Sequence, residues 1–236
     1  MILFIFIILI TFLLLIELNH QFRIRSPLLL KPSKFSKVLS DSNQKYIALV
    51  EIKNRHKRME VMVPYFKVHP KLIGISNDEI LTLRTKVEHH HPYDNEPNND
   101  YWSAYILKSK ASTLVQIEVE YQIKSSAKDN FICLWIDIEW GNYGPFGFFS
   151  RFDGFVLPNI SDGANQEISN NNLTEPIKTH ILGSLDDPIS ILKSYLPKNY
   201  LPTDIITIGE SPLAIMQGKY IDYRSINVSQ LAKILC

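Results

Sequence analysis

Short runs of β-branched and aromatic residues, several alternating with period two, fill the chain between Tyr46 and Pro158. The runs are YIALVEIKN, EVMVPYFKV, EILTLRTKVE, YWSAYIL, TLVQIEVEYQIK and FICLWIDIEW. Period-two alternation places successive side chains on opposite faces of a strand, and turn-rich breaks such as SSAKDN separate the runs. The pattern predicts an antiparallel, sandwich-like β-domain over residues 46–158, with about six or seven strands.

The first 18 residues, MILFIFIILITFLLLIEL, are apolar except for Thr11 and Glu17. As a helix they would extend about 27 Å, close to the roughly 30 Å of a bilayer's hydrocarbon core. A cleaved signal peptide is the alternative, but no basic n-region precedes the stretch and no small-x-small cleavage site follows it. A buried core helix is disfavoured because the stretch is apolar on every face. We expect residues 1–18 to be a retained transmembrane anchor.

Positive charge is concentrated directly behind this stretch. Residues 19–58 contain 10 Lys/Arg and 2 Asp/Glu, a balance of +8, although the whole chain carries only +1. Basic residues that flank a transmembrane helix tend to stay cytoplasmic and are attracted to anionic lipid head groups. We therefore expect a single-pass membrane protein with a cytoplasmic body and membrane lipids as partners. Nucleic acid is not an expected partner, because no stacking aromatic residues are interleaved with the basic ones.

Three further segments complete the expected organisation. Residues 19–45, which contain Pro27 and Pro32, are expected to be a basic juxtamembrane linker. Residues 159–174 are polar and Asn-rich, which is typical of an interdomain linker. In residues 175–236 the pattern predicts strands at PIKTHIL, DIITIG and within ESPLAIMQGKYI, and helices at DDPISILKSYL and SQLAKIL. The expected fold class is α+β: a transmembrane helix, an antiparallel β-sandwich-like domain and an incomplete α/β segment.

A run of three histidines, His89 to His91, is followed by Asp94, Glu96 and Asp100. Three imidazoles could recruit a metal ion, but consecutive residues on a strand or loop point in different directions. The ligand spacing is also undefined, and the two cysteines form no CxxC pair. We expect an exposed loop here and assign no metal ligands.

Two other features also have both a functional and a structural interpretation. Asp137 and Glu139 share one strand face, and Glu118 and Glu120 lie on another strand, but alternation predicts such charges on solvated faces of a sheet. The loop GNYGPFG, Gly141 to Gly147, is glycine-rich but lacks the Lys and Ser/Thr of a phosphate-binding loop. Its aromatic neighbours either form a binding surface or cap the core, and we favour the structural interpretation.

The strongest signal lies between Thr179 and Tyr220. In THILGSLDDPISIL, Asp186 and Asp187 open a helix, where exposed backbone N–H groups favour anions and carboxylates alike. In DIITIGESPLAIMQGKYI, a strand runs into a Gly-Glu-Ser-Pro turn, at the carboxyl end of a strand, where ligands of α/β proteins usually lie. Helix capping and an ordinary turn are the structural interpretation of the same residues.

At these residues the chain resembles the coenzyme F-420 gamma-glutamyl ligase family. The matching elements are Asp186-Asp187, Asp204-Ile-Ile, Gly209-Glu210-Ser211 and Gly218-Lys219. GESPLAIMQGKYI and the loop Asn142 to Pro145 are similar to the longer, membrane-anchored version of photosynthetic bacteria. The ligase-core match covers residues 175–236, and the looser match covers most of the chain. The resemblance implies that residues 175–236 are the N-terminal part of a gamma-glutamyl ligase-like domain.

The resemblance implies a GTP-dependent acid–amino acid ligase. GTP phosphorylates a carboxylate of the acceptor, the amine of L-glutamate displaces phosphate, and a divalent metal, Mg or Mn, neutralises the phosphate charge. Leu185 replaces a glycine of the family, and Ile215 stands where a basic residue is usual. The residues that match nucleotide contacts of the family are Thr179, His180, Ile181, Leu182, Glu210 and Ser211, beside the helix-start carboxylates Asp186 and Asp187.

The family's metal-binding carboxylates lie downstream of the last residue of this chain. The sequence therefore predicts a truncated ligase that is inactive alone, without assigned catalytic residues or metal ligands. A non-enzymatic, membrane-anchored binding or interaction module that uses the GNYGPFG loop is the alternative hypothesis. The acceptor substrate and the oligomeric state are left open.

Overall fold

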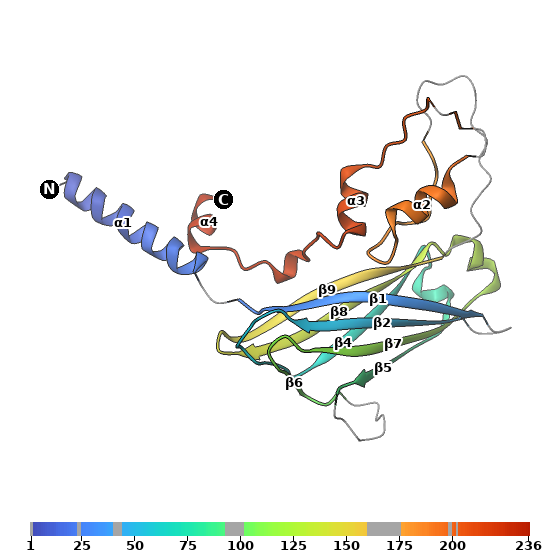
Figure 1. The fold of residues 1–236 in the computed structure, drawn as a ribbon, viewed down its shortest axis with the longest axis horizontal. Coiled ribbons are helices and arrows are strands. Elements are labelled where there is room, and N and C mark those ends of the chain that lie inside the picture. The colour runs from blue at the N-terminus through green and yellow to red at the C-terminus, as the bar shows by residue number, and fades with distance from the viewer. Residues whose placement is uncertain are drawn as a thin grey trace.

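The computed structural model describes residues 2–22, 25–39, 44–92, 102–159, 176–197, 200–201 and 203–236. Within these residues a long N-terminal helix is followed by a two-sheet β-domain and then by a segment with short helices (Figure 1). The helices are α1 (Ile2–Gln21), α2 (Pro188–Tyr195), α3 (Glu210–Met216) and α4 (Gln230–Leu235), with 3-10 turns η1 (Asn77–Glu79), η2 (Ser125–Asn130) and η3 (Tyr223–Ser225).

Helix α1 extends away from the β-domain and carries the apolar N-terminal stretch (Figure 1). Its window Phe4–Gln21 is long and apolar enough to cross a membrane, and its side chains are not buried against the rest of the protein. The Thr11 hydroxyl donates a hydrogen bond of 2.8 Å to the carbonyl of Ile7, which satisfies this polar group within the helix. Helix α1 therefore has the length and the apolar composition of a membrane-spanning helix, and it extends past residue 18 to Gln21.

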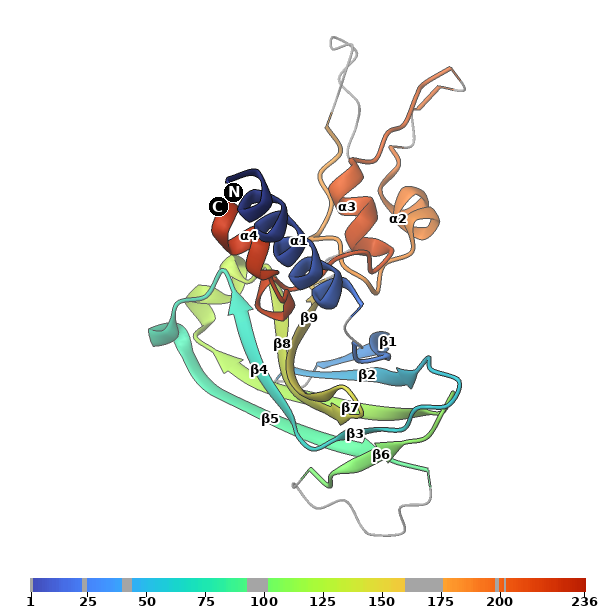
Figure 2. The ribbon, with the colours of Figure 1, turned by 90° about the vertical axis from the view of Figure 1, so that its left-hand side faces the viewer.

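Two antiparallel sheets pack face to face (Figure 2). The first has the order β1-β2-β7-β5, formed by β1 (Leu28–Leu39), β2 (Gln44–Asn54), β7 (Ser112–Ile123) and β5 (Ile80–His90). The second has the order β4-β8-β3-β6, with β9 paired to β8. Its strands are β4 (Phe66–Ile73), β8 (Cys133–Gly144), β3 (Val61–Val63), β6 (Tyr105–Leu107) and β9 (Gly147–Pro158).

The core lies between the two sheets and follows from the alternation of the sequence. Alternate residues of β2, β7 and β8 are buried there, because successive side chains on a strand point to opposite faces. Trp140 fills one part of this core, and Tyr46 stacks on Tyr121 with ring centroids 6.2 Å apart. Burial raises the pKa of Tyr46 to about 12, so this phenol stays neutral. The antiparallel sandwich predicted for residues 46–158 is therefore present.

The sandwich begins earlier than the sequence pattern indicates. Residues 19–45 were expected to be a linker, but they contain β1, which pairs with β2 from Leu28 opposite Asn54 to Leu39 opposite Gln44. The pairing shifts by one residue between Pro32 and Lys34, a bulge that accommodates proline at an edge strand. The basic residues of β1 make its sequence look like a linker rather than an alternating strand. In the structure β1 is the edge strand of the first sheet.

The segment after the sandwich differs from its expected pattern. Helices α2 and α4 are present, but among the described residues 176–236 no strand forms, because no neighbouring strand supplies ladder hydrogen bonds. Residues 210–216, expected as a turn and a strand, form helix α3 instead. Its first turn tolerates Pro212, and it ends at Met216, two residues before Gly218, whose φ of 66° suits the left-handed residue that follows a helix. Nearly all of the expected linker 159–174 lies outside the described residues.

Candidate functional site

The loop before α2 is organised around the carboxylate of Asp186. Asp186 Oδ2 accepts a hydrogen bond of 2.7 Å from the backbone N–H of Gly183, and Asp186 Oδ1 lies 3.2 Å from His180 Nε2. His180 Nδ1 lies 2.6 Å from the hydroxyl of Tyr195, at the end of α2. The side chains of His180 and Asp186 are each only 7% exposed. A Tyr–His–Asp chain of contacts thus holds the loop against its own helix.

This loop also contacts the sandwich. Gly183 approaches β9 closely, since a Cβ at this position would lie 3.3 Å from Cβ of Val156. Leu185, which replaces a glycine of the family pattern, packs against the hydrophobic core. The loop is therefore positioned by strand β9 of the sandwich as well as by α2.

Asp187 has a capping role at α2. Its carboxylate accepts hydrogen bonds from the backbone N–H and the hydroxyl of Ser190, at 2.9 and 3.0 Å, and Pro188 follows at the first helical position. These hydrogen bonds lower the pKa of Asp187, the backbone N–H of Ser190 contributing most. The carboxylate occupies the anion-favouring end of the helix, so the described geometry offers no phosphate position there.

The second expected nucleotide segment lies at the start of α3. Glu210 and Ser211 are both exposed, in the first turn of a helix of only seven residues. Among the described residues, no hydrogen bond or ion pair connects them to the segment from Thr179 to Leu182. Helices α2 and α3 are neighbours on the same side of the sandwich (Figures 1 and 2). The nucleotide contacts implied at these residues stay a prediction.

The described residues do not fit a divalent metal site. Within the described ranges no group of three or more His, Cys, Asp or Glu side chains could hold a metal ion. The carboxylate of Asp186 is engaged by Gly183 and His180, and that of Asp187 caps α2. Neither carboxylate is therefore assigned to Mg or Mn.

The three histidines are not an exposed loop. His89 and His90 belong to β5, and His91 is 6% exposed. The rings of His89 and His91 stack at 4.5 Å, and His91 also stacks on Tyr105 at 3.9 Å and lies 2.9 Å from the Thr113 hydroxyl. These contacts make His91 part of an aromatic cluster at the sandwich surface. Asp94, Glu96 and Asp100 lie outside the described residues.

The two carboxylate pairs are not brought together. Glu118 lies on the outer face of β7 and pairs with Lys45 at 2.6 Å, whereas Asp137 and Glu139 lie on the outer face of β8 in the other sheet. Asp137 is not solvated as expected, since only 6% of the residue is exposed. A residue of the C-terminal segment, Arg224, covers it.

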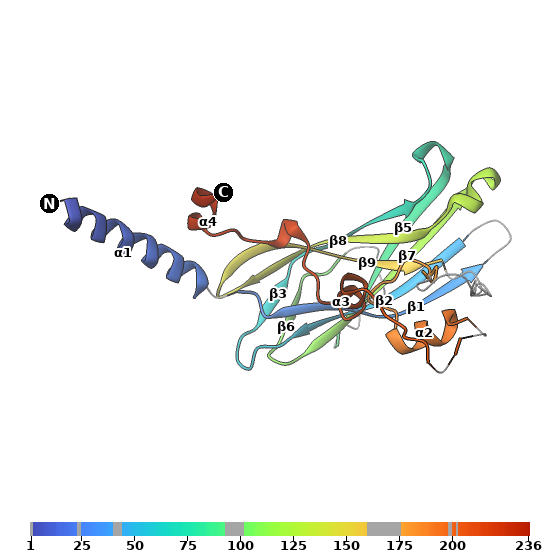
Figure 3. The same cartoon turned by 90° about the horizontal axis from the view of Figure 1, so that it is seen from above.

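The C-terminal segment from Tyr220 to Ser225 docks on strand β9 (Figure 3). In the described part of the chain β9 pairs only with β8, so its other edge presents free backbone groups. The Tyr220 hydroxyl donates to the carbonyl of Gly154 at 2.6 Å. Ser225 Oγ accepts from the Phe152 N–H at 2.7 Å and donates to the Phe152 carbonyl at 2.8 Å. The hydroxyls of Tyr220 and Ser225 thus form hydrogen bonds with backbone groups of Phe152 and Gly154 on this edge strand.

Arg224 is the main electrostatic contact of this docked segment. It donates to both carboxylate oxygens of Asp137, at 2.6 and 3.3 Å, and to Asp222 at 2.7 and 3.0 Å. Its guanidinium also lies 4.4 Å from the centre of the Phe152 ring, within cation–π range. The hydrogen bonds to Asp222 and Asp137 raise the pKa of Arg224, and those from Arg224 lower the pKa of Asp222.

Sequence reasoning missed this contact. Arg224 and Asp137 are 87 positions apart, and neither lies in a motif that points to the other. In the local sequence Asp222 precedes Arg224 by two residues. This spacing indicates a turn and gives no sign of a contact with Asp137.

The GNYGPFG loop is the turn of the β8–β9 hairpin. Phe146 is buried beside Phe149, and a Cβ at Gly144 would lie 3.0 Å from the Phe146 ring, so this turn does cap the core. Tyr143 and Phe148, which face each other across the hairpin, are 52% and 55% exposed. The expected core-capping role is present, and two aromatic side chains remain on the surface.

Two antiparallel sheets around one core, joined by hairpins and crossovers, define an Ig-like β-sandwich domain. The model of the family "F420-0:gamma-glutamyl ligase, N-terminal Ig-like domain" matches residues 29–161, more than half of the chain. The chain therefore belongs to this family. The match begins in β1 and ends just after β9, so it coincides with the whole sandwich.

Other comparisons add little. No curated protein matches the chain at a significant level. Among solved structures, the GAE domain of GGA2p from Saccharomyces cerevisiae aligns with 11% identity and a TM-score of 0.32, covering 58% of this chain and 95% of that one. A likeness of this size supports no inference about function.

Proposed function

We propose that the chain is the membrane-anchored N-terminal part of a gamma-glutamyl ligase, which joins L-glutamate to a carboxylate acceptor in a nucleotide-dependent reaction. The family match over the whole sandwich carries the proposal. Because the family's Ig-like domain belongs to F420-0:gamma-glutamyl ligase, F420-0 is the acceptor to test first. GTP and Mg or Mn are the cofactors that the proposal requires.

In this proposal the three parts of the chain have different roles. Helix α1 anchors the protein in a membrane, with the body on the cytoplasmic side. The sandwich holds residues 176–236, the beginning of the ligase-like unit, through the β9 edge and the Arg224–Asp137 ion pair. The loop from Thr179 to Leu182 and the Glu210–Ser211 turn are the proposed nucleotide contacts.

The chain itself is proposed to position and support the ligase unit rather than to catalyse alone. Its loop carboxylates already serve structural contacts, Asp186 to Gly183 and Asp187 to Ser190. Among the residues that the structure describes, no group of three or more His, Cys, Asp or Glu side chains could hold a metal ion. On its own, the 236-residue chain is expected not to form the amide bond.

The test uses the full chain purified in detergent micelles. It is incubated with F420-0, L-glutamate, GTP and Mn²⁺ or Mg²⁺, and glutamylated product is measured by mass spectrometry. In parallel, a photoreactive GTP analogue is cross-linked and the labelled peptides are mapped. Labelling at 179–182 or 210–211 without product formation supports the proposal. Product formation would overturn the supporting role, and no labelling of these segments would overturn the nucleotide contacts.

The second candidate function is a non-enzymatic binding module. The exposed pair Tyr143 and Phe148 on the β8–β9 hairpin favours it, because neither side chain is needed in the core. Phe148→Ala should leave the fold intact and abolish partner capture from solubilised membranes, whereas truncation of the buried Phe146 would disturb the fold itself. Unchanged capture by Phe148→Ala would remove this candidate.

A further inference from the structure

Several strand ends meet at the end of the sandwich nearest α1. Leu28 at the start of β1 pairs with Asn54 at the end of β2, and Lys53 pairs with Ser112 at the start of β7. The Asn54 side chain donates to the carbonyls of Met59 and Leu107, which brings in the connections that follow β2 and β6. We call this end of the sandwich, with the β2–β3 loop, the β6–β7 turn and the β8–β9 hairpin, the α1-proximal end.

The β2–β3 loop and the β6–β7 turn form one structural unit. The Lys110 N–H donates to the carbonyl of His56 at 3.2 Å, and the Ser109 hydroxyl donates to the carbonyl of Lys57 at 2.6 Å. Lys110 adopts a left-handed conformation, with a φ of 57°, which gives the turn a fixed shape. Side chains from the two connections are therefore held next to one another.

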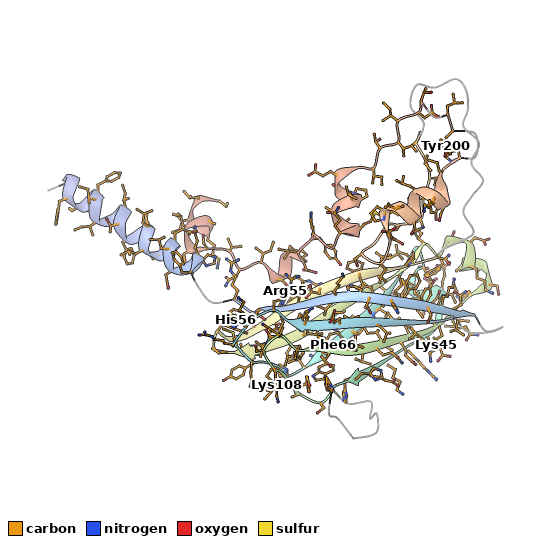
Figure 4. The ribbon with its side chains drawn as sticks, viewed as in Figure 1. Lys45, Arg55, His56, Phe66, Lys108 and Tyr200 are labelled. Carbon is orange, nitrogen blue, oxygen red and sulfur yellow. The ribbon has the colours of Figure 1, made fainter. Side chains whose placement is uncertain are left out.

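This unit carries a cluster of five positive charges. The five residues are exposed, and within the described part of the chain none of them forms an ion pair. One acidic residue, Glu60, lies in the same connections. Figure 4 shows Arg55, His56 and Lys108 gathered at the α1-proximal end, with Lys45 at the opposite end. The cluster consists of Arg55, Lys57, Arg58, Lys108 and Lys110.

The exposed aromatic pair lies at the same end. Asn142 of β8 accepts a hydrogen bond of 2.7 Å from the hydroxyl of Ser26, between α1 and β1. Tyr143 and Phe148 are the next cross-strand pair toward the tip of this hairpin. Aromatic side chains beside basic ones are the composition that suits a membrane–water interface, where rings sit at head-group level and cations meet lipid phosphates.

The connection to α1 limits how far this end can move from a membrane. Helix α1 ends at Gln21, and Ser26 is fixed to the sandwich, so the five intervening steps span at most about 18 Å. If α1 crosses a bilayer, the cluster must lie close to the lipid head groups. The exposed charges then act at distances near the Debye length of about 10 Å at 0.1 M salt.

We propose that the α1-proximal end of the Ig-like domain is a docking surface for an anionic bilayer. The cations of the cluster bind lipid phosphates and carboxylates, and Tyr143 and Phe148 enter the head-group layer. The contact fixes the tilt of the sandwich relative to the membrane. This proposal rests on the membrane anchoring of α1 in the proposed function, but it assigns a lipid-binding role to residues of the folded body.

The experiment places the full chain in nanodiscs of zwitterionic lipid, or of the same lipid with an anionic component, and measures lysine acylation by mass spectrometry. In anionic discs, Lys57, Lys108 and Lys110 should react at least about threefold more slowly, since each cation near such a surface is attracted to it. Lys124 and Lys128, at the opposite end of the sandwich, are the internal control. The protection should disappear at about 1 M salt.

A charge variant and a matched control sharpen the test. Arg55→Gln with Arg58→Gln should restore the reactivity of the three lysines in anionic discs, whereas Lys124→Gln with Lys128→Gln should not. Equal reactivity of Lys57, Lys108 and Lys110 in both kinds of disc would overturn the proposal, as would equal protection in both. Alkaline extraction of the same membranes tests the anchor separately. Extraction of a chain whose lysines are protected would contradict only the anchoring of α1.

Discussion

The Arg224–Asp137 contact leads to a quantitative prediction about the docked segment. Arg224→Ala removes both hydrogen bonds to Asp137, whose side chain is only 9% exposed, and leaves this carboxylate with Lys71 at 3.6 Å. A hydrogen bond to a charged group contributes about 1.5–3 kcal/mol, and the cation–π contact with Phe152 about 0.5–1 kcal/mol. Because Arg224 is about one-third exposed, solvent screens these contacts in part. We therefore expect Arg224→Ala to reduce the free energy of docking of the segment by about 2–3 kcal/mol.

This loss acts on docking rather than on the whole fold. At about 1.4 kcal/mol per tenfold change, the ratio of docked to undocked segment should fall by roughly 30- to 150-fold. The Phe152 amide reports it directly, because its N–H donates to Ser225 Oγ and not to β8. Hydrogen exchange of this amide should accelerate in Arg224→Ala, while amides in the centre of β7 keep their rates.

Lys71→Ala is the matched control. Lys71 contacts the same carboxylate, but its side chain is 61% exposed, and exposed ion pairs contribute about 0–1 kcal/mol. Exchange at Phe152 should therefore change little in this variant. Unchanged exchange of the Phe152 amide in Arg224→Ala, or an equal acceleration in Lys71→Ala, would refute the conclusion that Arg224 holds the docked segment on Asp137.

The remaining predictions concern single groups. Asp187→Ala should speed amide exchange throughout α2, and Asp187→Asn, which can still cap, should do so less. Ile136→Ala should lower the free energy of unfolding by about 2–5 kcal/mol, measured by denaturant titration, because this side chain is fully buried. A maleimide should label Cys236 but not Cys133, whose pKa is raised by burial; rapid labelling of both would contradict the structure. Since hydrogen bonds from Arg224 lower the pKa of Asp222 below its ordinary 3.8, the turn Tyr223–Ser225 should persist above that pH and weaken as the pH falls through the lowered pKa, which an NMR titration of the Asp222 and Arg224 signals would detect.

The β-sandwich could be predicted from the sequence because its strands carry their own signal. In β2 and β7 buried residues alternate with less buried ones, most of which are polar in β7, and this pattern does not depend on distant residues. Strand β1 could not be found in this way, since Lys31, Lys34 and Lys37 give it the composition of a basic linker. Its assignment depends on β2, whose edge it completes.

The candidate site was predicted less well, for a related reason. Asp137 lies at an outward position of β8, where alternation predicts a solvated charge, but Arg224, far along the chain, donates hydrogen bonds to it. The expected strand 204–209 is rich in isoleucine, but a strand without a neighbour has no hydrogen bonds to form. The local sequence pattern indicates which secondary structure a segment prefers. Whether that structure forms depends on the segments with which it pairs in the fold.

The docked residues Tyr220 and Ser225 have a consequence for neighbouring molecules. An uncovered edge strand is a template on which a second chain can add its own strand. By occupying the backbone groups of Phe152 and Gly154, the docked segment leaves these groups unavailable to a strand of a second copy. The contact that holds residues 220–225 on the sandwich thus also covers part of the exposed edge of β9.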